Sequence, residues 1–235
     1  LPLSLSAAGV PIDAANFPDP VFREYVQKFD TDKDGTLSDT ERLAVTTIVL
    51  EKQNNQLIKS IVGIKNFPNL EGFGSKESDL TEANLSGMTR LKSFGYSENN
   101  LESLNLSGCT ALGFVNCQFN RLTQIDLAGC SSLGTVFCNH NQLTELDVSN
   151  CPLLETLCIY ENHIASIDVT DNKKLIYFTV VPQEVTAQKT QTSGKWTVDL
   201  GKLVGKENLG KIASYSAGTL NTATGLLTLD RKSVV

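Results

Sequence analysis

The sequence has little positive charge, no long hydrophobic run and few residues of the common catalytic motifs, and each shortage argues against a class of function. Its 235 residues carry a net charge of −6, whereas a nucleic-acid-binding protein needs a basic face for the phosphates. No apolar run reaches the roughly 18 residues of a transmembrane helix. The sequence contains no glycine-rich phosphate loop and no nucleophile elbow. We therefore expect neither a nucleic-acid partner nor a membrane-spanning helix.

Histidine and cysteine, the residues that most often bind metals or act as nucleophiles, give no such signal here. The two histidines, His140 and His163, have no cysteine or serine partner at a diagnostic spacing, so we interpret them as solvated surface. Five of the six cysteines follow a spacing of 21 residues, as Cys109, Cys130 and Cys151 do, and only Cys158 lies outside it. Cysteines stacked by a repeat would point the same way, which is poor disulfide geometry. We predict free, buried thiols.

The segment DTDKDGTLSDTE, residues 30–41, has acidic side chains at its first, third, fifth and twelfth positions and a glycine at its sixth. Ca²⁺ takes roughly six to eight oxygen ligands, which a loop of this length can wrap around the ion. Apolar residues at helical spacing precede the loop, and Ser38 and Glu41 have the capping-box spacing of a helix that follows it. The predicted ligands are the side chains of Asp30, Asp32, Asp34, Ser38 and Glu41 and the backbone carbonyl of Thr36.

This helix–loop–helix resembles the EF-hand and the calcium loops of dockerin modules, which implies a Ca²⁺ cofactor. Calcium sensors usually pair two such loops, and this sequence contains one, so a structural calcium site is favoured over a regulatory one. The alternative is an acidic turn that binds no metal.

From Leu70 onward the apolar pattern repeats every 21 residues, with an asparagine at the ninth position of most units. The pattern L-x-x-L-x-L-x-x-N-x-L inside such a period is typical of leucine-rich repeats. The segments LGFVNCQFNRL and LTELDVSNC resemble the two halves of a bacterial 21-residue class that reads roughly LxxLxCxxNxLxxLDLxxN. Leucines open the successive units at Leu70, Leu91, Leu112, Leu133, Leu154 and Leu175.

The predicted fold is a β-rich leucine-rich-repeat solenoid of about five to six coils, because a single coil cannot bury its apolar residues and a stack can. An α-helical, EF-hand-like cap would cover its N-terminal end, and a small β segment would follow the repeats. The expected division is residues 1–16 as a disordered N-terminus or signal remnant, 17–50 as the cap, 51–181 as the solenoid, and 182–235 as a β-cap or partial immunoglobulin-like module.

Large aromatic residues occupy positions of the repeat that should face solvent. An exposed cluster of this kind suggests a binding surface, whereas isolated exposed residues need no such explanation. Two alternatives stay open: the C-terminal segment covers these residues, or they lie scattered. The predicted partner-binding residues are Phe114, Phe137 and Tyr177 on the strands, with Phe119 and Tyr160 just beyond them.

Asp126, Asp147 and Asp168 form a column at the fifteenth position of the repeat. Neighbouring coils stack about 4.8 Å apart, close to the separation of about 5 Å between the carboxyl groups of a retaining glycosidase. The repeat alone produces this spacing, so it is weak support for catalysis.

The resemblance to bacterial leucine-rich-repeat proteins implies a secreted or cell-surface location. The expected function is non-enzymatic recognition of a protein, or of a surface glycan, by a monomer with a structural calcium site. Two rival functions are a carbohydrate-active enzyme that uses the aspartate column and an architectural stalk that carries a C-terminal module.

Overall fold

The computed structural model describes residues 9–75, 77–165, 167–169 and 171–179, together with the backbone of five short strands between residues 190 and 228. The helices are α1 (Pro20–Val26), η1 (Gln27–Phe29), α2 (Asp39–Ala44) and η2 (Ile64–Asn66), where η marks a 3-10 helix. The strands are β1 (Val10–Pro11), β2 (Thr36–Leu37), β3 (Thr47–Leu50), β4 (Gly72–Ser75), β5 (Glu82–Asn84), β6 (Ser93–Gly95), β7 (Ser103–Asn105), β8 (Phe114–Asn116), β9 (Gln124–Asp126), β10 (Thr135–Phe137), β11 (Thr156–Cys158), β12 (Tyr177–Thr179), β13 (Thr190–Thr192), β14 (Lys195–Asp199), β15 (Ile212–Ser214), β16 (Thr219–Asn221) and β17 (Leu226–Thr228). None of these described helices is long and apolar enough to cross a membrane.

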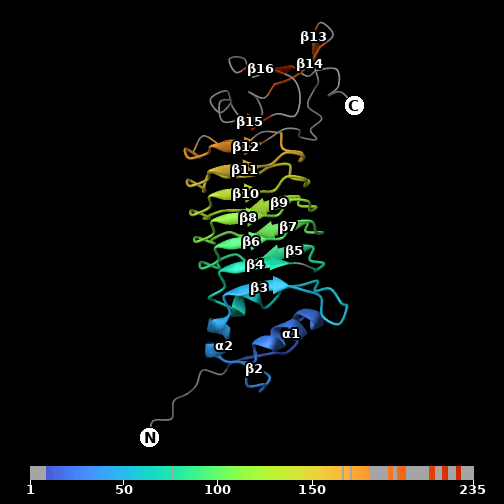
Figure 1. Ribbon diagram of the computed structural model, residues 1–235, viewed down its shortest axis with the longest axis vertical. Coiled ribbons are helices and arrows are strands. Elements are labelled where there is room, and N and C mark those ends of the chain that lie inside the picture. The colour runs from blue at the N-terminus through green and yellow to red at the C-terminus, as the bar shows by residue number, and fades with distance from the viewer. Residues whose placement is uncertain are drawn as a thin grey trace.

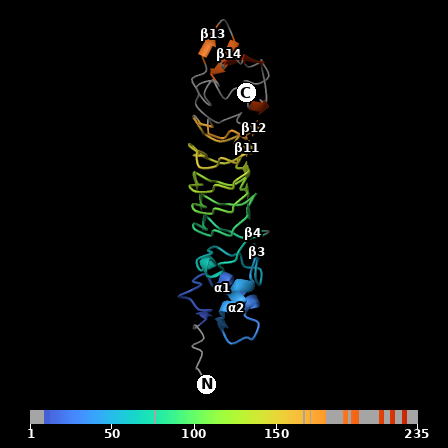
Figure 2. The ribbon, with the colours of Figure 1, turned by 90° about the vertical axis from the view of Figure 1, so that its left-hand side faces the viewer.

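The coils stack into a rod with a parallel sheet along each of two sides (Figure 1). The larger sheet has the order β15-β12-β11-β10-β8-β6-β4-β3, and the smaller one has the order β5-β7-β9. Within the larger sheet Thr135 lies opposite Phe114 on one side and Thr156 on the other, so each neighbour is one repeat away. The predicted leucine-rich-repeat solenoid is therefore confirmed. Seen from the side, the coils form a narrow stack with α1 and α2 at its N-terminal end (Figure 2).

Equivalent leucines of successive coils have the same surroundings. Leu112, Leu133 and Leu154 are each completely buried. Their amides all donate to the carbonyl three residues earlier, at 3.0, 3.1 and 3.1 Å. The inward residues of both sheets, such as Val115 on β8 and Leu104 on β7, belong to one hydrophobic core. Each coil thus buries its apolar residues against its neighbours, as the repeat predicts.

A ladder of buried asparagines joins the central coils. The Oδ1 atom of Asn141 accepts from the amide of Leu122 in the preceding coil at 2.9 Å. Its Nδ2 atom donates to the carbonyls of Cys117 and Cys138, both at 3.0 Å. Asn162 makes the corresponding bonds one coil later. These side chains satisfy backbone groups that would be costly to bury alone.

The first coils replace this ladder with a different arrangement. The side chain of Asn99 donates to the carbonyl of Ser97 at 2.6 Å, within its own coil. The amide of Leu80 instead donates to the hydroxyl of Tyr96 at 3.0 Å. That hydroxyl also shares a hydrogen bond of 2.8 Å with Ser78, which stands where later coils have asparagine. A buried tyrosine therefore performs the task of the asparagine amide at this point.

The helices of the cap are held by side chains at their N-termini. The Asp19 carboxylate accepts from the amides of Val21 and Phe22, which begins α1. The Oδ2 atom of Asp19 also accepts from the amides of Lys59 and Ser60, both at 2.9 Å, and so ties α1 to the first coil. Four side chains of α1 are buried and belong to the hydrophobic core: Val21, Phe22, Tyr25 and Val26.

The first strand of the larger sheet lies within residues 17–50, which the sequence analysis assigns to the cap. β3 pairs with β4 in parallel, with Thr47 opposite Gly72, 25 residues later, so the first coil is longer than the others. Of the predicted N-terminal segment, residues 1–8 lie outside the described residues, and Val10–Pro11 forms β1. The division of the chain into domains stays a prediction.

The chain ends in the predicted small β segment. Four of its strands form an antiparallel sheet in the order β13-β14-β17-β16. β15 instead joins the end of the larger sheet, parallel to β12, with Ile212 opposite Phe178. The remaining residues of 182–235, and with them the immunoglobulin-like interpretation, lie outside the described part of the chain.

Candidate functional site

Three of the predicted binding residues lie on the outer face of the larger sheet. Alternate residues of a strand point to opposite faces, so Phe114, Phe137 and Tyr177 point outward while their inward neighbours fill the core. Phe114 is 38% exposed and Tyr177 is 46% exposed. Phe137 is half-buried, and its ring meets that of Phe114 edge to face with 6.0 Å between centroids.

A second group gathers at the turn that follows these strands. The imidazole of His140 stacks on the ring of Phe119, with centroids 4.0 Å apart and an angle of 15° between planes. Tyr160 meets the imidazole edge-on at 5.2 Å. The Nδ1 atom of His140 lies 2.5 Å from the carboxylate of Glu161. Phe119 keeps 44% of its surface exposed although His140 covers one face of its ring.

The backbone conformation explains why the side chains of this second group line up in a column from coil to coil. Glu98, Phe119, His140 and Glu161 all occupy the eighth position of the repeat and have φ values of 57°, 55°, 55° and 51°. The left-handed conformation is uncommon for non-glycine residues, and here it recurs in four successive coils. The amide of Phe119 donates to the carbonyl of Asn139, so the turns are also linked from coil to coil. From the sequence, His140 is predicted to be solvated surface. The signal for its stacking is that it occupies the same repeat position as Phe119, one coil later.

The two groups lie on the same side of the rod and have an electrostatic link. Burial is the largest cause that raises the pKa of the Tyr160 phenol, and its neighbours Cys158, Glu161 and Tyr177 add to the shift. A tyrosine hydroxyl is protonated at neutral pH in any case, so this phenol can donate a hydrogen bond. We call the combined surface the aromatic face, and it consists of Phe114, Phe119, Phe137, His140, Tyr160 and Tyr177.

The acidic loop brings three of the predicted ligands together. Ligand oxygens of Asp30, Asp32 and Glu41 all lie within 4.8 Å of one another. Asp30 and Glu41 are buried, whereas Asp32 is exposed. Gly35 has a φ of 84°, which allows the chain to turn back at this point. The carboxylate of Asp34 lies against the loop backbone, where it accepts from the amide of Thr36 at 2.7 Å.

Both oxygens of Glu41 accept hydrogen bonds. One accepts from the hydroxyl and the amide of Thr31, at 2.7 and 2.6 Å, and the other from the hydroxyl and the amide of Ser38, at 2.8 and 2.9 Å. These bonds, led by that from the Thr31 hydroxyl, lower the pKa of Glu41 to about 2. The Ser38 and Glu41 pair also forms the capping box that begins α2. The closing carboxylate is therefore charged and fixed in place at neutral pH.

The acidic side chains of the loop repel one another. A hydrogen bond from the Asp34 amide lowers the pKa of Asp32, but burial and the charges of Asp34 and Glu41 outweigh it, so the net shift is upward. A cation between these carboxylates would relieve the repulsion. The strand of the loop, β2, pairs with β1, with Val10 opposite Leu37 and Pro11 opposite Thr36. β1 thus covers the edge of the loop's strand and ties residues 10–11 to the acidic loop.

Side chains of the aspartate column accept hydrogen bonds from backbone amides in the turns that follow them. The Oδ1 atom of Asp126 accepts from the amide of Ala128 at 3.0 Å, and that of Asp147 accepts from the amide of Ser149 at 2.8 Å. Hydrogen bonds from the Ser149 hydroxyl and amide lower the pKa of Asp147. Asn105 accepts from the amide of Ser107 in the same way one coil earlier. An uncharged asparagine makes the same hydrogen bond at this position, so the bond to the turn does not require the charge of an aspartate.

The cysteines are buried and unbridged, as predicted. All six are free thiols in the core. The Sγ atoms of Cys109 and Cys130 each donate to the carbonyl of a leucine in the preceding coil, at 3.2 Å. Burial raises the pKa of Cys130 to about 12 and that of Cys151 to about 11. Thiols with a raised pKa are poor nucleophiles, which agrees with a structural role.

Comparisons with known proteins place this chain by its fold. No protein-family model matches it, and neither does any curated protein. Among solved structures, a leucine-rich-repeat protein from Leptospira interrogans is 18% identical and matches 75% of this chain and 44% of that protein, with a TM-score of 0.52. Internalin C2 from Listeria monocytogenes is 20% identical and matches 89% of this chain and 97% of that protein, with a TM-score of 0.49. The chain therefore has the fold of a leucine-rich-repeat protein and spans less than half of its Leptospira neighbour.

Proposed function

We propose that this chain is a non-enzymatic recognition module that binds a partner protein through the aromatic face. The observation that carries the proposal is the clustering of exposed aromatic rings on one side of a rigid solenoid. Phe114 and Phe137 are in contact, as are Phe119, His140 and Tyr160, so the rings are not scattered singly. Rigid aromatic side chains supply contact area at low entropic cost, and they are enriched at protein interfaces.

The geometry also supports a protein rather than a small molecule as the partner. The face follows one side of a stack of coils, and such surfaces suit extended macromolecular contacts. Small-molecule sites are usually enclosed and bury most of their ligand. A surface glycan is the alternative ligand, because sugars also stack on exposed aromatic rings.

The experiment that tests this function compares the wild-type chain with a Phe114→Ala, Phe119→Ala double variant as bait. Host mucosal extract and cell-wall glycans are the two sources of ligand. Phe114→Ala removes the partner of Phe137, and Phe119→Ala removes the ring on which His140 stacks. A partner captured by wild type and lost by the double variant would support the proposal. Equal capture by both baits, confirmed with a purified partner, would contradict it.

A control variant separates recognition from catalysis. Asp147→Asn keeps an oxygen that can accept from the Ser149 amide, as Asn105 does from Ser107. We expect this variant to fold normally and to retain full partner binding. Loss of a carbohydrate-cleaving activity in Asp147→Asn, with wild type active, would favour the enzymatic alternative instead.

We further propose that the acidic loop holds a structural Ca²⁺. The residues fit this ion because Asp30, Asp32 and Glu41 offer clustered carboxylate oxygens, the hard ligands that calcium prefers. The carbonyl of Thr36 and the side chains of Asp34 and Ser38 lie in the same loop and would complete the ligand set. The ion would neutralise the carboxylates, of which two are buried, and fix the loop between α1 and α2. A secreted or cell-surface location and a monomeric state belong to the same proposal.

A further inference from the structure

Glu41, which would close the proposed calcium site, has every acceptor position of its carboxylate in use. Its Oε1 atom accepts from the amide of Thr31 at 2.6 Å and from the hydroxyl of Thr31 at 2.7 Å. Its Oε2 atom accepts from the amide of Ser38 at 2.9 Å and from the hydroxyl of Ser38 at 2.8 Å. An ionised carboxylate offers about four lone-pair positions, two on each oxygen. A cation bound to both oxygens of Glu41 would therefore replace one hydrogen bond on each.

The other two clustered carboxylates are less occupied. The Oδ1 atom of Asp30 accepts from the amide of Asp34 at 3.2 Å, and its Oδ2 atom accepts from the amide of Gly35 at 2.9 Å. The Oδ1 atom of Asp32 accepts from the amide of Asp34 at 3.3 Å. Both aspartates keep lone-pair positions that a cation could use without displacing a hydrogen bond. Competition for the proposed ion is therefore concentrated at Glu41.

The main chain on both sides of the loop is anchored to the first coil. Before the loop, the ring of Phe29 meets that of Phe67 edge to face, with 5.4 Å between centroids. After the loop, the guanidinium of Arg42 donates to the carbonyl of Asn66 at 3.2 Å. Both contacts fall on neighbouring residues of one segment, so the two ends of the loop have the same support.

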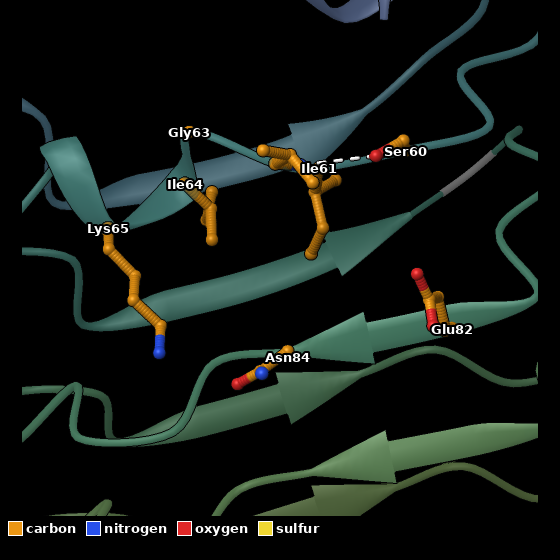
Figure 3. A pocket seen from close by; sticks show the side chains of 8 residues that line it. Ser60, Ile61, Gly63, Ile64, Lys65, Glu82 and Asn84 are labelled. Atoms are coloured by element: carbon orange, nitrogen blue, oxygen red, sulfur yellow. Dashed lines mark hydrogen bonds between the residues drawn. The ribbon is translucent and has the colours of Figure 1, made fainter. Parts of the chain in front are cut away.

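That support is part of the hydrophobic core. It continues back to residues 60–65, from which the buried side chains of Ile61 and Ile64 point toward the next coil (Figure 3). The anchored main chain keeps the amides of Thr31 and Ser38 in place beside Glu41. A hydroxyl, by contrast, can leave by rotation about one side-chain bond. A cation at Glu41 would therefore displace hydroxyls and leave the amides bonded.

The two hydroxyls differ in what they do after release. The Oγ atom of Ser38 also accepts from the amide of Glu41 at 3.3 Å, and Ser38 belongs to the predicted ligand set. Its oxygen could therefore serve the ion once its proton has turned away from the carboxylate. Within the described part of the chain, the hydroxyl of Thr31 bonds to Glu41 alone, and Thr31 lies outside the ligand set. Its hydrogen bond would be lost without replacement.

We propose that the Thr31 hydroxyl competes with Ca²⁺ for the Glu41 carboxylate and thereby lowers the calcium affinity of the loop. This inference rests on the proposed calcium site and assigns control of its affinity to a residue that is not a ligand. Thr31 is exposed, so Thr31→Val removes the hydroxyl, keeps the shape of the side chain and leaves no cavity. Thr31→Ser keeps the hydroxyl and is the matched control.

Isothermal titration calorimetry with CaCl₂ measures the competition directly. Thr31→Val should bind calcium about threefold to thirtyfold more tightly than wild type, because no hydrogen bond from a hydroxyl at this position has to be broken. Thr31→Ser should bind with the affinity of wild type. Calcium binding by Thr31→Val under conditions where wild type shows none would support the same competition.

Thermal melting separates this role from a purely structural one. In EGTA, Thr31→Val should melt below wild type, because it lacks the hydrogen bond to Glu41. At saturating CaCl₂ the two proteins should melt at nearly the same temperature, because the bond is then absent from both. A hydroxyl that only stabilises the loop would lower the melting temperature of Thr31→Val equally in both solutions.

Three results would overturn the inference while leaving the calcium site in place. They are calcium binding by Thr31→Val that is no tighter than that of wild type, an equal gain of affinity in Thr31→Ser, and an equal loss of melting temperature in EGTA and in CaCl₂. Failure of the calcium site itself has a different result. In that case neither wild type nor either variant binds calcium at about millimolar concentration, where the weakest extracellular calcium modules still bind.

Discussion

The central coils and the N-terminal end of the rod use different kinds of contact to reach the same burial. In the central coils Asn141 and Asn162 make the same hydrogen bonds one repeat apart. At the N-terminal end each contact occurs once, such as the hydroxyl of Tyr96 on the amide of Leu80 and the carboxylate of Asp19 on two amides of the first coil. Repetition therefore stabilises the coils, and individual side chains stabilise the end.

This difference determines how many contacts between and within coils a single substitution weakens. The side chain of Asn141 bonds to two backbone groups of the preceding coil and also within its own coil, so its loss weakens both that interface and the turn of its own coil. Among the described residues, the side chain of Asn99 bonds only within its own coil, so its loss leaves the interface with the preceding coil intact. The two proposed sites follow the same division, because the aromatic face lies along the repeated coils and the acidic loop lies in the cap.

The largest effect is expected from breaking the ladder. Asn141→Ala leaves the amide of Leu122 and the carbonyls of Cys117 and Cys138 without their partner. We expect it to lower the free energy of unfolding by about 3–5 kcal/mol, because each buried unpaired group is costly. Asn99→Ala, at the same position of an earlier coil, removes one bond within its own coil and should cost about 1 kcal/mol. Urea denaturation of both variants measures the difference, and equal losses would contradict the distinction between the two regions.

Calcium removal should act on the cap and spare the coils. Chelation with EGTA is expected to lower the melting temperature by roughly 5–10 °C, since a ligand at about a hundred times its Kd stabilises by about 2.7 kcal/mol. Asp30→Asn should remove this sensitivity, whereas Asp39→Asn, an exposed position of α2 outside the ligand set, should keep it. An identical melting curve for wild type with and without EGTA would show that the loop binds no calcium.

The hydroxyl of Tyr96 should matter at the first coils. Tyr96→Phe keeps the buried ring and deprives the amide of Leu80 and the hydroxyl of Ser78 of their partner. We expect a loss of about 1–3 kcal/mol in the free energy of unfolding. Tyr177→Phe changes an exposed tyrosine and should be nearly neutral. If both variants unfolded like wild type, the hydroxyl of Tyr96 would not be replacing the asparagine amide.

The smallest expected effect is a loss of stability at alkaline pH. It concerns the coils, because all six cysteines lie there. Burial raises the pKa of Cys130 from an ordinary value of about 9 to about 12, so the unfolded chain releases this proton first as the pH rises. The thiol's contribution to stability is present below about pH 9 and is lost between about pH 9 and 12. Cys130→Ala should flatten the decline of unfolding free energy over this range. An unchanged slope would mean that the thiol ionises equally in the folded and unfolded states.

The repeated part of the fold was predictable because its contacts recur. Leu112, Leu133 and Leu154 share one environment, so a period of 21 residues in the sequence reports their positions directly. The five aromatic residues of the predicted binding surface followed from the same period. Three of the predicted loop ligands, Asp30, Asp32 and Glu41, are clustered as expected, although calcium binding itself stays a prediction.

The rest could not be predicted because it depends on contacts that occur once. Nothing in the repeat indicates that Tyr96 would take over from Asn99, since the exchange depends on a ring long enough to reach the amide of Leu80. The pairing of β1 with β2 joins segments that share no pattern. The stacking of His140 on Phe119 occurs at a turn where both residues have a left-handed backbone, which is uncommon for non-glycine residues and has no marker in the repeat.

Hydrogen–deuterium exchange of the chain, alone and bound to its captured partner, tests the central claim most directly. If the aromatic face is the recognition surface, partner binding should slow exchange in residues 114–119, 137–140 and 160–161, where its rings lie. Exchange around Asp126 and Asp147, in the smaller sheet and its turns, should change little. Slowed exchange confined to those aspartate turns, with the aromatic segments unchanged, would contradict the account.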